Sequence, residues 1–258
     1  MDLQLKNKKV FISGSTKGIG FAAAKIIARE GAEVIINGSS QDSVNEALAK
    51  LKKETENKKI SGIPCDFSKT EEIKSLIKKL GSVDVLVNNV GIFKNKDFFD
   101  TTDEDWQNFY NLNVMSAVRL SRALMPKMLE NNWGRILFIS SESALNIPVE
   151  MIHYGMTKTA LLSISRGLAE LTKSSNVTVN SILPGPTKTE GLVSQIPDDK
   201  SFEEFEKEFF KNDRPTSILQ RFADPDEVAQ LIAYVSSPLS SATNGASLRV
   251  EGGVVKHI

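Results

Sequence analysis

The sequence predicts an α/β fold in which one parallel sheet of seven strands is covered by helices on both faces. Short, continuously apolar runs alternate with longer segments that carry apolar residues at three- and four-residue spacing. Continuous apolar strands that alternate with helices are typical of parallel sheets buried on both sides. No Pro- or Ser-rich linker interrupts this alternation, so we expect a single domain over residues 1–258.

The order of elements follows from the same alternation. The expected strands are 10–13, 34–37, 60–65, 83–88, 136–140, 177–183 and 246–250. The expected helices are 20–30, 43–54, 70–80, 104–130, 154–173 and 226–236. Gly31, Gly81 and Gly134 each stand between a helix and the next strand, where glycines that end helices are expected.

One long segment, residues 186–223, lacks a strand pattern. It contains an amphipathic stretch, 201–212, with four phenylalanines. Long excursions from a compact domain are usually functional lids or disordered, and loops at the carboxyl ends of parallel strands surround the ligand. We therefore expect residues 186–223 to form a substrate lid. The phenylalanines either dock this segment on the body or line the site, and one arrangement can do both.

Composition excludes several classes of protein. The 32 Lys+Arg balance the 32 Asp+Glu, so the formal net charge is +0, which argues against general binding of nucleic acids. No stretch approaches the roughly 18 apolar residues of a membrane span, and the first six residues lack the apolar centre of a signal peptide. A single cysteine, Cys65, and no Cys/His cluster make disulfides and metal sites unexpected. We expect a cytoplasmic protein without nucleic-acid or membrane partners.

The first strand is followed by a glycine-rich turn that is typical of dinucleotide binding. Its three glycines allow a tight turn, a close approach to a pyrophosphate, and packing of the next helix on the sheet. The helix N-terminus adds free N–H groups. The GxxxGxG spacing could also belong to a structural turn, but its place between the first strand and the first helix favours a cofactor site. The expected contacts here are Gly14, Ser15, Thr16, Lys17, Gly18, Ile19 and Gly20.

The end of the second strand favours NADP(H) over NAD(H). A carboxylate there would bind the ribose 2′-hydroxyl and repel a 2′-phosphate. The strand instead leads into Gly38, Ser39 and Ser40, with no carboxylate before Asp42. These small side chains leave space for a phosphate, and Lys17 offers it a positive charge unless this lysine is simply solvated.

Tyr154 and Lys158 are candidate catalytic residues. They are four residues apart at the start of a helix and so share one face. A free tyrosine has a pKa of about 10, and a nearby ammonium group is expected to lower it. Ser141 ends the fifth strand, so its hydroxyl can lie near Tyr154. We expect the adjacent His153 to pack or to line the substrate site, and Glu142 to face either the pocket or solvent.

The sequence resembles the short-chain dehydrogenase/reductase family over essentially the whole chain, in its subset of roughly 250 residues with TGxxxGxG and YxxxK motifs. Ser13 stands where threonine is commoner, and Val90 replaces the alanine of the NNAG element. The motifs that match are the glycine turn (Gly14, Gly18, Gly20), the adenine-contacting aspartate (Asp66, before Phe67), NNAG (Asn88, Asn89, Gly91), the helix asparagine (Asn113), the triad (Ser141, Tyr154, Lys158) and PGxxxT (Pro184, Gly185, with Thr187 or Thr189).

This resemblance implies a doubly wound Rossmann fold and a role for each catalytic residue. Ser141 would bind the substrate carbonyl oxygen, where negative charge develops as hydride arrives. Tyr154 would donate the proton. Lys158 would lower the tyrosine pKa and hold the nicotinamide ribose, and Asn113 would support a water chain that resupplies the proton.

The expected activity is reversible hydride transfer between NADP(H) and a carbonyl or alcohol, with an apolar ketone or aldehyde as the preferred substrate. One alternative is a 3-oxoacyl-[acyl-carrier-protein] reductase, although lysines stand after the NNAG element where such enzymes present arginines. A second is a non-catalytic NADP-binding sensor, which would be expected to lose a member of the triad. The resemblance also implies a homotetramer or homodimer formed through the helices at 104–130 and 154–173.

Overall fold

The computed structural model, which describes residues 2–257, contains a seven-stranded parallel sheet with the strand order β3-β2-β1-β4-β5-β6-β7. Every predicted strand is present, with ends within two residues of those expected. The strands are β1 (Lys9–Ile12), β2 (Glu33–Gly38), β3 (Ile60–Pro64), β4 (Val85–Asn88), β5 (Gly134–Ile139), β6 (Val177–Pro184) and β7 (Ser247–Val250).

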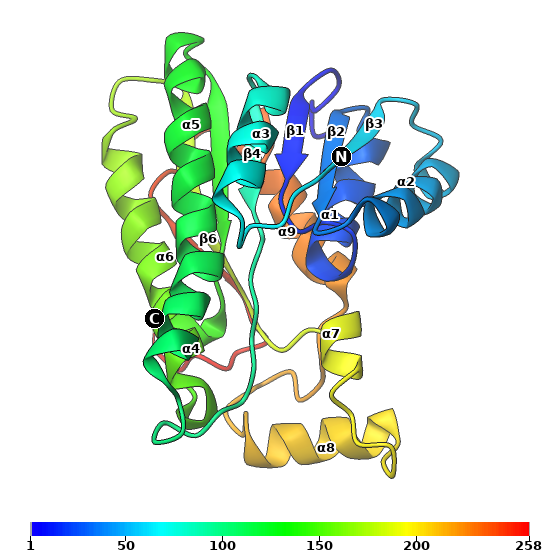
Figure 1. Cartoon of the computed structure of the whole chain (residues 1–258), viewed down its shortest axis with the longest axis vertical. Helices are drawn as coiled ribbons and strands as arrows, with labels where there is room; N and C mark the ends of the chain where they lie inside the picture. Colours follow the sequence, from blue (N-terminus) through cyan, green and yellow to red (C-terminus); the bar gives the residue numbers. More distant parts are fainter. Residues whose placement is uncertain (1, 258) are drawn as a thin grey trace.

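Helices cover both faces of this sheet, and the predicted fold class is confirmed (Figure 1). One face carries α1 (Gly18–Arg29), α2 (Gln41–Thr55) and α9 (Pro225–Val235), and the other carries α3 (Thr70–Leu80), α5 (Ser116–Glu130) and α6 (Ile152–Glu170). Each layer packs its apolar residues against one side of the strands, which gives two apolar clusters separated by the sheet. Within residues 2–257, no helix combines the length and apolarity that a membrane span requires.

The single helix expected at 104–130 is interrupted in the structure. It consists of α4 (Asp103–Phe109), a π-helical stretch (Tyr110–Met115) and α5. The apolar spacing continues through all three parts, so sequence periodicity does not reveal the wider π turns. π-helical turns within α-helices are frequent at functional sites, and this one contains Asn113.

One of the three glycines expected to end helices does not do so. Gly31 and Gly81 have positive φ after α1 and α3, as predicted, but Gly134 begins β5. Asn132 takes the left-handed conformation after α5 instead, with φ 52°. Gly134 is needed for a different reason: a Cβ there would lie 2.6 Å from the Cβ of Met128. The prediction was wrong because close packing can select glycine as strongly as a turn does.

Residues 186–223 form a flap whose two ends pair with each other. Thr187 and Ala223 form a parallel β-bridge, and the Ala223 N–H donates to the Pro186 carbonyl at 2.9 Å. Between them lie α7 (Glu190–Val193) and α8 (Phe202–Asn212). Figure 1 shows α8 set apart from the sheet, beyond the carboxyl ends of the strands.

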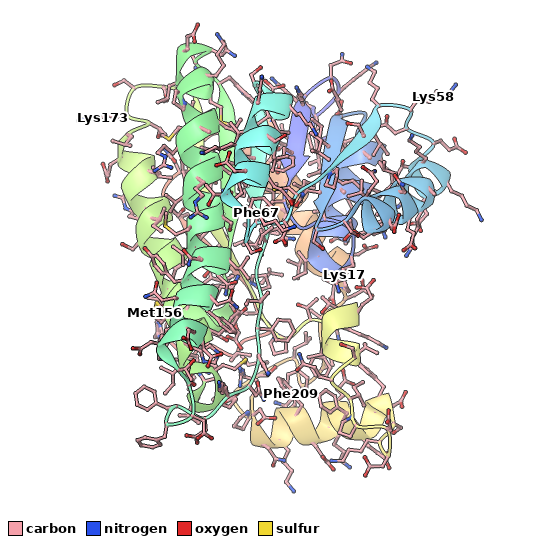
Figure 2. The ribbon with its side chains drawn as sticks, viewed as in Figure 1. Lys17, Lys58, Phe67, Met156, Lys173 and Phe209 are labelled. Atoms are coloured by element: carbon pink, nitrogen blue, oxygen red, sulfur yellow. The ribbon has the colours of Figure 1, made fainter. Side chains whose placement is uncertain are left out.

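An aromatic cluster holds α8 in place. All four phenylalanines of α8 (Phe202, Phe205, Phe209 and Phe210) have ring centroids within 6.0 Å of Phe222. Phe222 is itself buried just before the flap rejoins α9. Figure 2 shows Phe209 on the side of α8 that faces the rest of the molecule. The phenylalanines therefore pack α8 against the far end of the flap, and Phe205 and Phe209 also line the cavity described below, which is one of the two roles that the sequence left open.

Candidate active site

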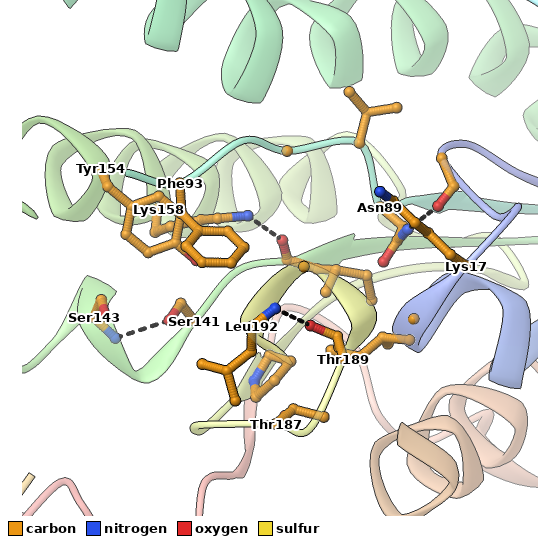
Figure 3. Close-up of a pocket in the computed structure, with 18 of the residues that line it drawn as sticks. Lys17, Asn89, Phe93, Ser141, Ser143, Tyr154, Lys158, Thr187, Thr189 and Leu192 are labelled. Carbon is orange, nitrogen blue, oxygen red and sulfur yellow. Dashed lines mark hydrogen bonds between the residues drawn. The ribbon is translucent and has the colours of Figure 1, made fainter. Parts of the chain in front are cut away.

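A cavity of about 610 Å³ lies at the carboxyl ends of the strands, between the sheet and the flap (Figure 3). This size is ordinary for a small-molecule or cofactor site. The strand order reverses at β1, which pairs with both β2 and β4. Residues that follow β1 and β4 line the cavity, so it lies at this reversal. Doubly wound sheets bind their ligands at this reversal. Residues from the glycine turn, from the ends of β4 to β6 and from α6 to α8 all line it.

Glycine is required at three positions of the turn after β1, namely Gly14, Gly18 and Gly20. Gly14 and Gly18 both have φ +59°, a conformation that other residues rarely adopt. A Cβ on Gly20 would lie 2.6 Å from the Gly14 carbonyl oxygen and 2.5 Å from the Asn89 amide nitrogen. The N-cap residue of α1, Lys17, makes no side-chain hydrogen bond to the first turn of the helix, and Gly18 and Ile19 of that turn line the cavity.

Asn89 holds this turn against β4. Its side-chain amide donates to the Ser13 carbonyl at 3.1 Å and to the Gly14 carbonyl at 2.7 Å. The Ser13 hydroxyl accepts the N–H groups of Asn89 and Val90 at 3.0 and 3.2 Å. The serine that replaces the commoner threonine thus makes the connection between the two loops, and both loops line the cavity.

Ser141, Tyr154 and Lys158 come together at one end of the cavity. Figure 3 shows Tyr154 and Lys158 projecting from the same side of α6, with Ser141 beneath the tyrosine. The Lys158 ammonium lies 5.5 Å from the Tyr154 ring centroid and donates to the Ile139 carbonyl at 3.0 Å. Gly91 leaves room for it, since a Cβ there would approach Lys158 Nζ to 3.2 Å.

The electrostatics of this trio differ in one respect from the prediction. Desolvation raises the pKa of Tyr154, while a hydrogen bond from the Ser141 side chain and the positive charge of Arg214 act to lower it. Desolvation also lowers the pKa of Lys158 to about 8. The pKa of Tyr154 is therefore raised rather than lowered, because desolvation outweighs the charges around it.

The Asn113 side chain lies behind the cavity and does not line it. Its carboxamide oxygen accepts the Ile92 N–H at 2.8 Å, and its nitrogen donates to the Ile92 carbonyl and the Thr157 hydroxyl, each at 3.0 Å. The side chain is fully buried, and these partners occupy the amide. Asn113 therefore ties the loop after β4 to α6, and its support of a water chain stays a prediction.

Most predicted cofactor residues line the cavity, and four do not. Ser15 is fully buried and its hydroxyl donates to the Ile12 carbonyl. Ser40 caps α2 by accepting the Ser43 N–H, and Asn88 donates to the Ser121 hydroxyl. Gly20 supports the turn from inside α1. These four residues support the segments that line the cavity but do not line it themselves. Those on the cavity wall are Gly14, Thr16, Lys17, Gly18, Ile19, Gly38, Ser39, Asp66, Phe67, Asn89, Gly91, Pro184, Gly185, Thr187 and Thr189.

A charged wall opposite Tyr154 was not predicted. Glu142 faces the cavity, which resolves the alternative left open by the sequence, and its carboxylate accepts from Arg214 Nε at 2.7 Å. Arg214 Nη1 also donates to Glu150 at 3.1 Å. His153, in contrast, packs against Phe109 with ring centroids 4.2 Å apart and does not line the cavity.

Glu190 is a second unpredicted feature. Its carboxylate accepts the Gly18 N–H at 2.9 Å, so α7 of the flap contacts the glycine turn directly. The contact joins residues 172 positions apart in the chain, and no local sequence pattern signals it.

Comparison with known proteins identifies a family of similar oxidoreductases. The family model described as Enoyl-(Acyl carrier protein) reductase matches residues 14–255. The Bacillus subtilis protein named Uncharacterized oxidoreductase YvrD is 49% identical, with 100% of both chains covered. Dehydrogenase/reductase SDR family member 4 of Caenorhabditis elegans is 33% identical over 97% of this chain and 96% of its own. The structure of L-sorbose reductase from Gluconobacter frateurii, complexed with NADPH and L-sorbose, superposes with a TM-score of 0.91 at 29% identity and covers 100% of both chains.

Fold and site together define an oxidoreductase built to bind a nicotinamide cofactor. The chain belongs to the short-chain dehydrogenase/reductase family.

Proposed function

We propose that this protein catalyses the reversible reduction of a ketone or aldehyde with NADPH. The observation that carries the proposal is the convergence of Ser141, Tyr154 and Lys158 at one end of a cavity whose other end is the glycine turn. Within this arrangement a carbonyl substrate would lie between the catalytic hydroxyls and the cofactor. Residues 186–223 would act as the lid over both. A homotetrameric or homodimeric assembly in the cytoplasm stays a prediction.

The residues present fit a dinucleotide. The glycine turn gives the backbone a close approach, and the start of α1, which the Lys17 side chain does not cap, offers N–H donors to a pyrophosphate once Glu190 releases that of Gly18. At the end of β2, Gly38 and Ser39 line the cavity without a carboxylate, and Lys17 lines the same cavity. When bound, NADPH supplies the hydride. The NADPH complex of L-sorbose reductase supports the choice of cofactor.

The chain's own residues would handle the oxygen and its proton. The Ser141 hydroxyl accepts the Ser143 N–H at 3.1 Å, which fixes its position, and it donates to Glu142 Oε2 at 3.3 Å, a bond that it would exchange for one to the substrate oxygen. Tyr154, whose raised pKa keeps it protonated at neutral pH, would donate its proton to that oxygen. Lys158, held by the Ile139 carbonyl, would place its ammonium toward the nicotinamide ribose.

Lys17 provides a test of cofactor preference. Lys17→Ala is expected to weaken NADPH binding roughly tenfold, because a charge-assisted hydrogen bond to the 2′-phosphate contributes about 1.5 kcal/mol or more. NADH binding should change little. Fluorescence titration with both cofactors measures this, with Lys58→Ala as the control, since Lys58 lies far from Lys17 (Figure 2). Equal losses for NADPH and NADH would contradict the assignment.

Glu190 predicts the opposite effect on the same cofactor. Its carboxylate occupies an N–H group at the start of α1, where a pyrophosphate would bind. Glu190→Gln is therefore expected to tighten NADPH binding by about threefold, since a charge at a helix N-terminus contributes roughly 0.3–1 kcal/mol. Isothermal titration of NADPH measures the change, with Glu203→Gln on α8 as the control. Weaker binding by the variant would show that Glu190 instead helps to close the flap over the cofactor.

The charged wall favours a substrate that carries hydroxyl groups. Glu142 and Glu150 present carboxylate oxygens to the cavity, and these accept hydrogen bonds from hydroxyls but not from an apolar ketone. L-sorbose, bound by the 29% identical reductase, is a hydroxyl-rich ketone. Phe93, Phe205 and Phe209 line the cavity as well, so part of the substrate contacts aromatic rings. A hydroxylated ketone fits both surfaces better than the wholly apolar substrate expected from the sequence.

A panel of carbonyl compounds tests the proposal. NADPH oxidation should be measured with L-sorbose, hydroxyacetone, cyclohexanone and acetophenone, and we expect turnover with the hydroxylated ketones to exceed that with the other two. Faster turnover of a 3-oxoacyl thioester would favour the carrier-protein reductase. Binding of NADPH without turnover of any compound would favour a sensor and contradict the proposal.

A further inference from the structure

An ion pair connects the flap to the catalytic serine. Arg214 follows α8 in the flap, and its Nε donates to Glu142 Oε1 at 2.7 Å. Only 4% of each side chain is exposed. Glu142 directly follows Ser141, and the Ser141 hydroxyl lies 3.3 Å from its second oxygen, Oε2. A continuous path of contacts therefore runs from Arg214 through one carboxylate to the hydroxyl that faces the substrate.

Arg214 is itself held in a defined orientation. Its Nη1 donates to Glu150 Oε1 at 3.1 Å and to the Asp213 carbonyl at 2.8 Å. The guanidinium carbon also lies 5.6 Å from the Phe209 ring centroid. Each of these residues lines the same cavity as Ser141 and Tyr154. The guanidinium is thus fixed at the boundary between the flap and the reaction centre.

Docking of the flap does not require this pair. The N–H groups of Ile218 and Leu219 already donate to the Gly252 carbonyl at 2.8 and 2.9 Å, and the Thr216 hydroxyl donates to the Val254 carbonyl at 2.7 Å, so the flap is attached to the C-terminal segment without it. Removing two charges from water is costly, and apolar side chains of similar size are often as stable in such a position. A buried arginine and glutamate beside the catalytic serine therefore call for an explanation in the chemistry of the site.

We propose that Arg214 is a positioning residue that neutralises Glu142 and so keeps the Ser141 hydroxyl available to the substrate oxygen. The inference rests on the proposed carbonyl reduction. Without the guanidinium, the Glu142 carboxylate would accept the serine proton more strongly and would oppose the negative charge that develops on the substrate oxygen. Because Arg214 belongs to the flap, the reaction centre is complete only when the flap is docked.

The charges that face Tyr154 give this proposal a second signature. They are Lys158 on its own helix, Glu142 after β5 and Arg214 from the flap, with Glu150 and Asp213 further along the cavity wall. Glu142 acts to raise the pKa of Tyr154 and Arg214 acts to lower it. In alcohol oxidation, where the tyrosine must lose its proton, Arg214→Met should move the rise of rate with pH to higher pH. Glu142→Gln should move it to lower pH.

A double-mutant cycle tests the inference in the ketone that the panel shows to be reduced fastest. Arg214→Met is expected to lower kcat roughly 100-fold, the scale of losing one donor to the developing oxyanion. The double variant Arg214→Met/Glu142→Gln is expected to recover to within about tenfold of the wild type, since the uncompensated carboxylate is then gone. Arg221→Met is the matched control, because Arg221 also pairs from the flap, with Glu227, but its side chain is 46% exposed.

Several outcomes would overturn the inference. It fails if Arg214→Met keeps the wild-type kcat, or if the double variant is as slow as Arg214→Met alone, which would indicate a merely structural contact. It also fails if both single variants shift the pH profile in the same direction. Should Arg214→Met not fold, the double variant, in which only the partly exposed Glu150 loses its partner, still decides the question. Loss of all turnover in the wild type would instead count against the proposed function.

Discussion

Tyr154→Phe is expected to abolish carbonyl reduction while NADPH binds almost as tightly as to the wild type. The change removes one hydroxyl from the end of the cavity and leaves the ring, which packs near Phe93 with centroids 6.3 Å apart. Losing a general acid costs up to about 10,000-fold in rate, and we expect a loss of at least about 1,000-fold in kcat. Steady-state NADPH oxidation and cofactor titration measure the two effects separately.

Tyr234→Phe is the matched control for this prediction. Tyr234 lies on α9 with 39% of the residue exposed, so the same loss of a hydroxyl there should leave both turnover and binding unchanged. If Tyr154→Phe keeps a tenth or more of the wild-type kcat, the proton comes from another group and the assignment of the site is wrong.

Gly20→Ala is expected to impair both the fold and cofactor binding. The new methyl group would lie 2.6 Å from the Gly14 carbonyl oxygen and 2.9 Å from the Ser15 Cα, and neither backbone atom can move without shifting the turn. Overpacking of this kind costs about 1–3 kcal/mol in the free energy of unfolding. A displaced turn would also lose its N–H contacts to the pyrophosphate, for which we expect roughly 100-fold weaker NADPH binding. Thermal unfolding and titration measure the two changes.

Gly167→Ala is the control that separates this steric argument from a general effect of replacing glycine. Gly167 lies on α6, is exposed, and a Cβ there would meet no atom within 4 Å. Because alanine favours helices by about 1 kcal/mol over glycine, this variant should be slightly more stable and should bind NADPH normally. If Gly20→Ala behaves in the same way, the close packing of the turn has no part in cofactor binding.

Most of the sheet could be predicted from the sequence, because each strand is short and continuously apolar and the strands are separated by segments with helical periodicity. It also placed Gly14 and Gly18 correctly at the turn, since positive φ is a demand that glycine meets locally. The π-helical stretch around Asn113 could not be found in this way, because its apolar spacing matches that of the helices on either side.

The missed parts of the site come from contacts between distant segments. Glu142 and Arg214 are 72 positions apart, and their pairing depends on the path of a flap that has no strand pattern. Before its partner is located, the Glu142 carboxylate beside Ser141 can equally well be interpreted as exposed to solvent. The predicted direction of the Tyr154 pKa shift was wrong for a related reason. Charged neighbours on one helix face can be identified from the sequence, whereas the desolvation that outweighs their effect on the pKa arises only in the folded protein.

Transfer of deuterium from the cofactor tests the central claim most directly. The wild-type protein would be incubated in two separate reactions, each with NADPH deuterated at a different face of nicotinamide C4, and with the ketone of the panel that is reduced fastest. The alcohol from each reaction would be analysed by mass spectrometry. We predict one deuterium on the carbinol carbon from one of the two labelled cofactors and none from the other. Alcohol without deuterium from either cofactor, or no alcohol at all, would contradict hydride transfer in this cavity.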